Sequence, residues 1–193
     1  MSLAPRILAF AGSTRKESFN KKLVQIGANG AKEAGADVTI IDLKDFPLPL
    51  FDEDLEAADG SPPNALAIKN LFLAHQGILI SSPEYNSSIT AVLKNTLDWI
   101  SRPVPGEARL AAFQGKVASL LSASPGALGG LRGLVHLRAV LGNIGVIVLP
   151  DQISVPRAHE AFDGGGSLKD NKQQADVQRL GRTLAETVRR LNS

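Results

Sequence analysis

Cysteine is absent from this chain of 193 residues, and tryptophan, tyrosine and methionine each occur once. The absence of cysteine excludes thiol nucleophiles, disulfides and cysteine-ligated metal sites. His75, His136 and His159 are the only histidines, and because their spacing does not suit a metal site we expect no bound metal. The sequence also lacks an apolar run near the ~20 residues that a membrane span requires, which predicts no membrane partner.

The chain also lacks an excess of charge of either sign, because it has 21 lysines and arginines and 19 aspartates and glutamates. A formal charge of +2 is too small to indicate a nucleic-acid partner. The first residues do not have the charged and then apolar pattern of a secretion signal, so we expect a cytoplasmic protein. With 44% hydrophobic residues, residues 1–193 are expected to form one domain with a sizeable core.

Five short apolar runs, often rich in β-branched residues, predict buried strands. They are residues 7–10, 38–41, 78–80, 117–121 and 146–149. Segments with helical spacing lie between and after these runs, most clearly over residues 89–100 and 177–191. Because the runs are continuously apolar, both faces of the sheet should be covered, which is typical of parallel strands with helices on either side.

The alternation of strands and helices predicts an α/β fold with a doubly wound, five-stranded parallel sheet and helices on both faces. The flavodoxin-like strand order 2-1-3-4-5 is the commonest for this size, whereas dinucleotide-binding sheets usually have a sixth strand. Two longer irregular stretches, residues 44–63 and 157–166, are expected on the surface. The first is most simply a solvated loop, with a lid or a subunit contact as the alternative; the second leads to a helix that Ser167 is expected to cap.

Three polar loops should meet at the carboxyl edge of this sheet. In the order 2-1-3-4-5 the first and third strands are neighbours, and the loops after them open a crevice there. The loop after the fourth strand would form the far wall. We call these the first, second and third loops; they are residues 12–20, 82–88 and 122–130.

The first loop carries the donor groups that a phosphate monoester accepts. Ser13, Thr14 and Ser18 offer hydroxyl groups. Arg15 adds a guanidinium, and the start of the next helix adds backbone N–H groups. A simpler interpretation is that Ser18 only caps the helix and that Arg15 is a solvated charge. Glu17 and Ser18 stand where a P-loop would have its glycine and lysine, which disfavours nucleoside triphosphates as its ligand. Thr14 and Glu17 stand where a GxGxxG turn would have glycines, which disfavours dinucleotides.

The second loop suits a planar heteroaromatic ring. Tyr85, the only tyrosine, supplies a flat apolar face, and Asn86 supplies hydrogen-bonding groups. A proline turn at Pro83 followed by a helix cap at Ser87 or Ser88 would explain the other residues without any ligand. The glycines of the third loop would let its backbone approach such a ligand closely.

The stretches GSTRKESFN, SPEYNSSITAVLKNTLDW and SASPGALGG resemble the three signature stretches of the NADPH-dependent FMN reductase family, which includes bacterial quinone, chromate and azo-dye reductases. Two further segments, LKDFPLPLFDEDLE and FDGGGSLKDNK, also resemble the family, so the similarity covers nearly the whole chain. Its most specific element is PEYN at residues 83–86, followed by Leu93-Lys94-Asn95 and Asp98. Thr90 departs from the pattern, because many members carry proline there.

The resemblance implies non-covalently bound FMN. It places Ser13, Arg15, Ser18 and Asn20 around the phosphate; Pro83, Glu84, Tyr85, Asn86 and Ser87 along the isoalloxazine and ribityl; and Ser124 and Gly126 near the far side of the ring. It implies no catalytic side chain, because the flavin itself takes hydride from NAD(P)H and passes electrons on. The expected function is an NAD(P)H-dependent FMN oxidoreductase that reduces quinones, flavin, azo compounds or metal oxyanions by a ping-pong mechanism.

Two alternatives remain at this point. A flavodoxin-like electron carrier would bind FMN without oxidising NAD(P)H, although such carriers tend to be strongly acidic; a non-redox binding protein would have kept only the fold. The resemblance also implies a homodimer or a dimer of dimers, with the helix of Asp98 and Trp99 at the interface; the residues alone indicate a solvated acid and a packing aromatic. No separate site for the 2′-phosphate of NADPH stands out, so both NADPH and NADH are candidate co-substrates.

Overall fold

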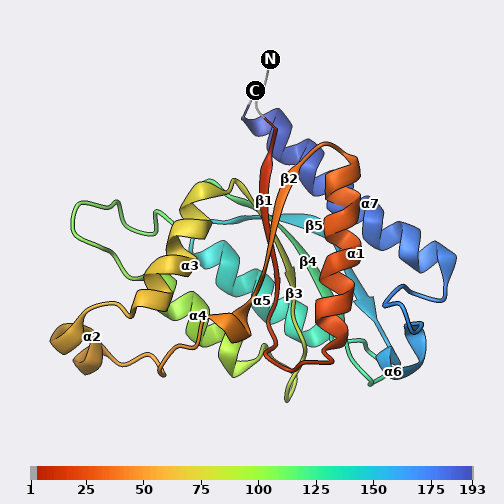
Figure 1. The fold of residues 1–193 in the computed structure, drawn as a ribbon, viewed down its shortest axis with the longest axis horizontal. Coiled ribbons are helices and arrows are strands. Elements are labelled where there is room, and N and C mark those ends of the chain that lie inside the picture. The colour runs from red at the N-terminus through yellow and green to blue at the C-terminus, as the bar shows by residue number, and fades with distance from the viewer. Residues whose placement is uncertain (1–3, 193) are drawn as a thin grey trace.

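A five-stranded parallel sheet forms the centre of the computed structural model, which describes residues 4–192 (Figure 1). The strand order is β2-β1-β3-β4-β5, and each neighbouring pair is parallel. This confirms the predicted flavodoxin-like order. The strands are β1 (Arg6–Ala11), β2 (Asp37–Asp42), β3 (Gly77–Ser81), β4 (Val117–Ala123) and β5 (Ile147–Val155).

Helices cover both faces of the sheet, with α1 and α7 on one side and α3, α4 and α5 on the other (Figure 1). Within residues 4–192, none of the helices combines the length and the apolar character needed to cross a membrane. The helices are α1 (Phe19–Glu33), α2 (Glu53–Asp59), α3 (Pro63–Ala74), α4 (Ala91–Ser101), α5 (Leu131–Asn143), α6 (Ala158–Ala161) and α7 (Asn171–Leu191), with a 3-10 turn η1 (Leu43–Asp45).

Strand β1 shows why the strands are continuously apolar. Ile7 and Ala9 belong to the core beneath α1 and α7. Leu8 and Phe10 belong to the core beneath α3, α4 and α5. Because successive side chains of a strand point to opposite faces, a strand covered on both sides is apolar at most of its positions.

Helices α1 and α7 cross with their backbones in contact. A Cβ atom on Gly181 would lie 1.9 Å from the carbonyl oxygen of Gly27, and one on Gly30 would lie 2.0 Å from that of Gln178. Any side chain at these two positions would push the helices apart. The crossing therefore fixes α1, and with it the loop that precedes α1, against the last helix of the chain.

Strand β5 extends well beyond the predicted residues 146–149. The pairing with β4 shifts, because Ala118 pairs with Val148 and Leu120 with Gln152. Pro150 lies in the resulting bulge, where its missing N–H does not interrupt the ladder. The Arg138 guanidinium of α5 holds this bulge by donating to the carbonyl groups of residues 148, 149 and 150 and to the side chain of residue 152.

Residues 44–63 are more ordered than the simple loop interpretation suggests, because they contain part of η1 and the whole of α2. Trp99 of α4 anchors this segment: its Nε1 donates to the Pro49 carbonyl at 2.8 Å, and its ring meets Phe51 edge-on at 5.0 Å. Only 1% of Trp99 is exposed, so it is the packing aromatic that the residues alone indicated.

The predicted cap at Ser167 is wrong. Helix α7 begins at Asn171, and the Asp170 carboxylate accepts hydrogen bonds from the N–H groups of Lys172 and Gln173. Ser167 instead lies in the preceding turn, where its N–H donates to Asp163. The carboxylate is a strong cap and also interacts favourably with the positive end of the helix dipole.

Lys116, at the amino edge of the sheet, carries a buried amino group. Its Nζ donates to the His75 carbonyl at 2.6 Å, and only 7% of the residue is exposed. Burial, together with the nearby charge of Arg6, lowers the pKa of Lys116 from its ordinary 10.5 to about 8. The folded protein therefore releases this proton more readily than the unfolded chain does.

We expect the stability of the protein to rise with pH relative to a Lys116→Met variant. Between pH 8 and pH 10.5 the unfolded chain binds the Lys116 proton while the folded chain does not, so raising the pH favours folding. At about 1.4 kcal/mol per pKa unit, the free energy of unfolding should gain about 2 kcal/mol over the variant between pH 7 and pH 10. Urea titrations of both proteins at the two pH values measure this gain; parallel pH profiles would contradict the assignment.

Candidate functional site

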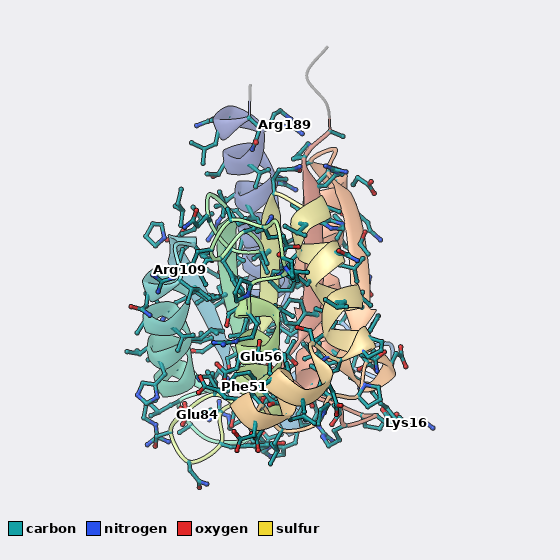
Figure 2. All side chains as sticks on the ribbon, turned by 90° about the vertical axis from the view of Figure 1, so that its left-hand side faces the viewer. Lys16, Phe51, Glu56, Glu84, Arg109 and Arg189 are labelled. Atoms are coloured by element: carbon teal, nitrogen blue, oxygen red, sulfur yellow. The ribbon has the colours of Figure 1, made fainter. Side chains whose placement is uncertain are left out.

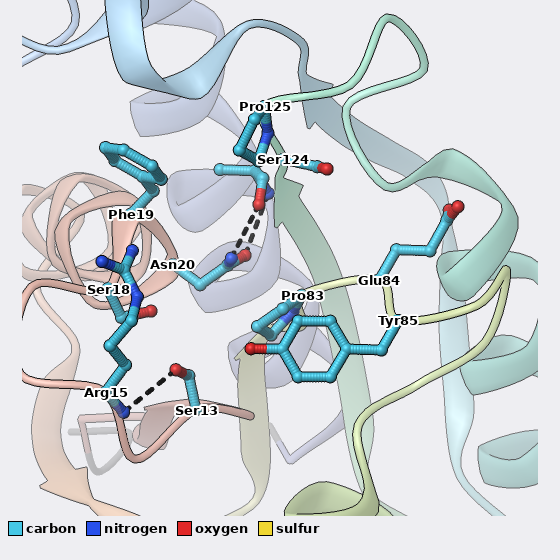
Figure 3. A pocket seen from close by; sticks show the side chains of 11 residues that line it. Ser13, Arg15, Ser18, Phe19, Asn20, Pro83, Glu84, Tyr85, Ser124 and Pro125 are labelled. Atoms are coloured by element: carbon cyan, nitrogen blue, oxygen red, sulfur yellow. Dashed lines mark hydrogen bonds between the residues drawn. The ribbon is translucent and has the colours of Figure 1, made fainter.

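A cleft opens at the carboxyl edge of the sheet, where the three loops meet (Figure 3). Its volume is about 260 Å³, just below the range of roughly 300–1,000 Å³ typical of small-molecule sites. The residues that line it are Ser13, Arg15, Ser18, Phe19, Asn20, Pro83, Glu84, Tyr85, Ala123, Ser124 and Pro125.

The cleft thus brings together all of the predicted site residues except Asn86, Ser87 and Gly126. Sequence reasoning missed Phe19, Ala123 and Pro125, which also line the cleft. Each is adjacent in the chain to a predicted site residue. Including the neighbours of the predicted residues in the first and third loops would therefore have identified them.

Arg15 and Ser18 of the first loop are available to an anion. Ser18 occupies the N-cap position of α1, but its side chain makes no capping hydrogen bond. The guanidinium carbon of Arg15 lies 5.2 Å from the centre of the Phe19 ring, and within residues 4–192 no carboxylate is paired with it. The simpler interpretation of Ser18 as only a cap therefore does not account for its hydroxyl.

Phe19 connects this loop to the C-terminal part of the chain. Its ring stacks on Phe162 with the two planes 10° apart and the ring centres 5.9 Å apart. Arg15, Phe19 and Phe162 form one stack, in which the guanidinium lies over an aromatic face. The stack restricts where the Arg15 side chain can lie and keeps it beside the cleft.

Asn20 joins the start of α1 to the ends of two strands. Its Nδ2 donates to the Ala123 carbonyl at 2.8 Å, and its Oδ1 accepts from the Ala123 N–H at 2.9 Å (Figure 3). The same Oδ1 accepts from the Ser81 hydroxyl at 2.8 Å. Only 3% of the residue is exposed. Because the oxygen already accepts two hydrogen bonds, the second N–H of Nδ2 is the part of this amide that can serve a ligand.

The second loop forms a tight turn at the mouth of the cleft. Tyr85 and Ser88 exchange two backbone hydrogen bonds of 3.0 Å, and the residues between them, Asn86 and Ser87, have φ of 51° and 66°. Positive φ at both central residues is typical of a type I′ turn. The turn holds the Tyr85 side chain 59% exposed at the mouth, and the side chains of its two central residues do not line the cleft.

Glu84 fastens the second loop to α5. Its side chain extends away from the Tyr85 ring (Figure 3), and its carboxylate accepts from Arg132 at 2.9 and 2.6 Å and from the Gly133 N–H at 3.0 Å. Burial raises the pKa of this carboxyl, but the hydrogen bonds from Gly133 and Arg132 outweigh burial and hold the pKa below its usual range. The carboxylate is therefore charged and engaged by α5.

Two glycines of the third loop have a structural role that the sequence did not predict. Gly129 and Gly130 have φ of 62° and 92°. A Cβ on Gly129 would lie 2.7 Å from the Pro156 nitrogen, and one on Gly130 would lie 1.9 Å from the Ser122 hydroxyl. At these positions glycine permits close contact within the protein itself. Gly126, the remaining glycine of the set, donates its N–H to Ser124 Oγ at 3.3 Å and does not line the cleft.

Thr90, rather than Ser87 or Ser88, caps helix α4. Its Oγ1 accepts from the Leu93 N–H at 3.2 Å and donates to the Gly12 carbonyl at 2.7 Å. The two serines cannot cap α4, because they belong to the preceding turn. Many family members carry proline at this position, and proline has no hydroxyl. Thr90 therefore provides a hydrogen bond between the start of α4 and the first loop that proline could not form.

Known proteins resemble this chain along nearly its whole length. A model of the NADPH-dependent FMN reductase family matches residues 5–160. An NAD(P)H-dependent FMN reductase of Pseudomonas aeruginosa is 35% identical over 187 residues, which cover 96% of each chain. An NADPH:quinone oxidoreductase of Arabidopsis thaliana is 34% identical over 195 residues, covering 96% of this chain and 93% of that protein.

A solved structure with the same fold is the flavoenzyme NAD(P)H:(acceptor) oxidoreductase of Paracoccus denitrificans. Its TM-score against this chain is 0.80 at 26% sequence identity, and the match covers 98% of this chain and 100% of that one. The family match ends at residue 160, so Phe162 and α7 lie outside it.

Replacing Thr90 by valine should destabilise the protein by about 2 kcal/mol. Valine keeps the shape but leaves the buried Gly12 carbonyl and the Leu93 N–H without their partner. The free energy of unfolding from denaturant titration measures the loss. Thr90→Ser is the matched control, because it keeps the hydroxyl and should lose much less; equal losses in the two variants would show that the methyl group, not the hydroxyl, matters.

Proposed function

This chain belongs to the NADPH-dependent FMN reductase family, and from that premise we propose how it works. Its cofactor is FMN and its co-substrate is NAD(P)H. We propose that FMN binds in the cleft of Figure 3 and that electrons pass from NAD(P)H to a quinone or a related small acceptor. The observation that carries this proposal is one cleft with the hydroxyl groups and guanidinium of the first loop at one end and the exposed Tyr85 ring at its mouth.

The donors of the cleft fit the two ends of FMN. Ser13, Arg15 and Ser18 form a set of hydroxyl and cationic groups that suits a phosphate dianion. Asn20 contributes its remaining N–H there, and its main role is to hold the loop in place. Arg15 is fixed in position by its stack, so less conformational entropy is lost when the phosphate binds.

The apolar end of the cleft fits a planar ring. Pro83, Tyr85 and Pro125 present flat or rigid apolar surfaces. Ser124 adds a hydroxyl on the opposite wall. Glu84 serves through its backbone, because its carboxylate is held by α5. Asn86, Ser87 and Gly126 shape the turn and the loop around the ring and are not among the groups that line the cleft.

Bound FMN supplies the hydride-transfer chemistry. The protein binds the cofactor, orients it and leaves one side of the cleft open at its mouth. Glu84 is the acidic residue among the described residues that line the cleft, but its carboxylate is bound by Arg132 and Gly133, which keeps it from exchanging protons with a substrate. Because donor and acceptor reach the cleft through the same mouth, we propose that they bind in turn and that the kinetics are ping-pong.

The candidate acceptors are quinones, flavin, azo compounds and metal oxyanions. Of these we favour quinones. Tyr85 and Leu128 are 59% and 50% exposed on the second and third loops, and such surfaces suit flat aromatic molecules. A relative from Arabidopsis thaliana is named as an NADPH:quinone oxidoreductase.

We also propose that the protein acts as a homodimer or a dimer of dimers. Val135 and Leu131 of α5 are 58% and 41% exposed close in sequence to the Glu84 partners Arg132 and Gly133, so apolar surface continues beyond the second loop. Asp98 of α4 is already paired with Lys94 within its own chain, and Trp99 is covered. Light scattering coupled to size-exclusion chromatography measures the assembly; a monomer at micromolar concentration would contradict it.

Replacing Arg15 by alanine should weaken FMN binding about 10- to 100-fold while changing riboflavin binding little. A charge-assisted hydrogen bond is worth about 1.5–3 kcal/mol, and only FMN carries the phosphate that would receive it. Quenching of flavin fluorescence measures both affinities. Equal weakening of FMN and riboflavin would contradict the contact.

Steady-state kinetics test the proposed reaction. With the FMN-loaded protein, double-reciprocal plots of NAD(P)H oxidation at several quinone concentrations should give parallel lines, and quinones should show the highest kcat/KM of an acceptor panel. Intersecting lines would contradict the ping-pong order. A yellow protein that does not oxidise NADPH or NADH would instead support the electron-carrier alternative.

A further inference from the structure

A second groove, separate from the cleft, runs between the start of α1 and the turn at residues 163–167. Its volume is about 740 Å³ with the open mouth included. Ser18 lines both the groove and the cleft, so the two hollows lie on either side of this residue, next to Arg15 in the first loop. The groove is lined by Lys16, Ser18, Lys21, Lys22, Gln25, Ile26, Asn29, Gly165, Gly166, Ser167 and Gln174.

Two lysines of this groove have no acidic partner. Lys21 is paired with Asp42, but in the described range of 4–192 neither Lys16 nor Lys22 forms an ion pair. Figure 2 shows Lys16 extending outward at the same end of the molecule as Glu84. The stem of Lys22 packs near Gly166, where a Cβ would lie 3.7 Å from its Cγ. The groove therefore holds unpaired positive charge on a partly fixed side chain.

Apart from Lys21, whose charge is paired with Asp42, the remaining groups of the groove are neutral. Among residues 4–192, no aspartate or glutamate lines it. The carboxylate of Asp163, in the adjoining turn, accepts hydrogen bonds from the N–H groups of Gly165 and Ser167 and is engaged by that turn. Gln25 and Asn29 are hydrogen-bonded to each other at 3.2 Å. Two unpaired ammonium groups among neutral polar side chains form a site for an oxyanion.

We propose that this groove binds the 2′-phosphate of NADPH and thereby makes the enzyme prefer NADPH to NADH. The inference rests on the proposed function, because it needs a nicotinamide at the ring end of the cleft. The two co-substrates differ by one phosphate, which carries about −1.5 to −2 charges at neutral pH. A ligand that extends past the Arg15 end of the cleft enters the groove at Ser18 and meets Lys16 and Lys22.

Charge-removing variants of the two lysines test the site. The double variant Lys16→Gln/Lys22→Gln should raise the KM for NADPH about tenfold and leave kcat and the KM for NADH within about twofold. A change in KM alone is expected, because the phosphate is far from the reacting atoms and contributes uniform binding. Lys32→Gln is the matched control: Lys32 lies at the other end of α1, is exposed and has no ion-pair partner in the described part of the chain.

Binding of a nucleotide fragment gives a readout that does not depend on turnover. Adenosine 2′,5′-bisphosphate should bind the FMN-loaded protein at least about tenfold more tightly than 5′-AMP, and this difference should disappear in the double variant. Calorimetry measures both affinities. The preference for the 2′-phosphate should also weaken as salt is raised, because Lys16 is exposed to solvent and Lys22 is only partly buried.

Three results would overturn the proposal. They are equal affinities of the two fragments for the unchanged protein, equal rises in KM for NADPH and NADH, and a loss of FMN affinity in the double variant. The third would assign the lysines to the FMN phosphate instead. If the protein oxidised neither nucleotide, the proposed function would fail, while the fragment measurement would still decide whether the groove binds a 2′-phosphate.

Discussion

The side-chain amide of Asn20 is the junction on which the cleft depends. It hydrogen-bonds to both backbone groups of Ala123 and to the Ser81 hydroxyl, and so fixes the start of α1 against the ends of β3 and β4. Leaving such buried groups without partners costs about 1–3 kcal/mol each, so the three elements hold their relative position firmly. The first loop lies directly before this junction and the third loop directly after it. Their separation across the cleft is therefore set by one buried side chain.

Charged groups around the cleft divide into two kinds. The Glu84 side chain is only 7% exposed and fully engaged, and it sets the position of a loop. Arg15 and Lys16 are exposed and unpaired within residues 4–192, and they are free to meet a ligand. Burial makes a charge expensive unless it is paired, so the covered Glu84 carboxylate needs Arg132, while an unpaired ion has to stay at the surface. This division explains how exposed cations can lie on a stable scaffold.

The sheet could be predicted from the sequence because the signal is local and repeated: each strand contains a short apolar run, and the central strands are apolar on both faces, as Ile7 and Leu8 illustrate. The strand order also predicted which edge of the sheet carries the cleft. The caps could not be predicted, since several serines, threonines and aspartates compete near each helix start, and the turn geometry decides in favour of Thr90 and Asp170. The bulge at Pro150 could not be predicted either. It depends on Arg138, whose guanidinium reaches the carbonyl groups of the bulge only in the folded chain.

The stack of Phe19 on Phe162 and the glycine crossing of α1 and α7 have a consequence for biosynthesis. A ribosome delivers residues 13–20 early, but their packing partners, Phe162 and α7, follow much later in the chain. Domains fold as units once their interacting segments have emerged. The Arg15 end of the cleft therefore takes its final shape only after α7 has left the ribosome, long after its own residues were made.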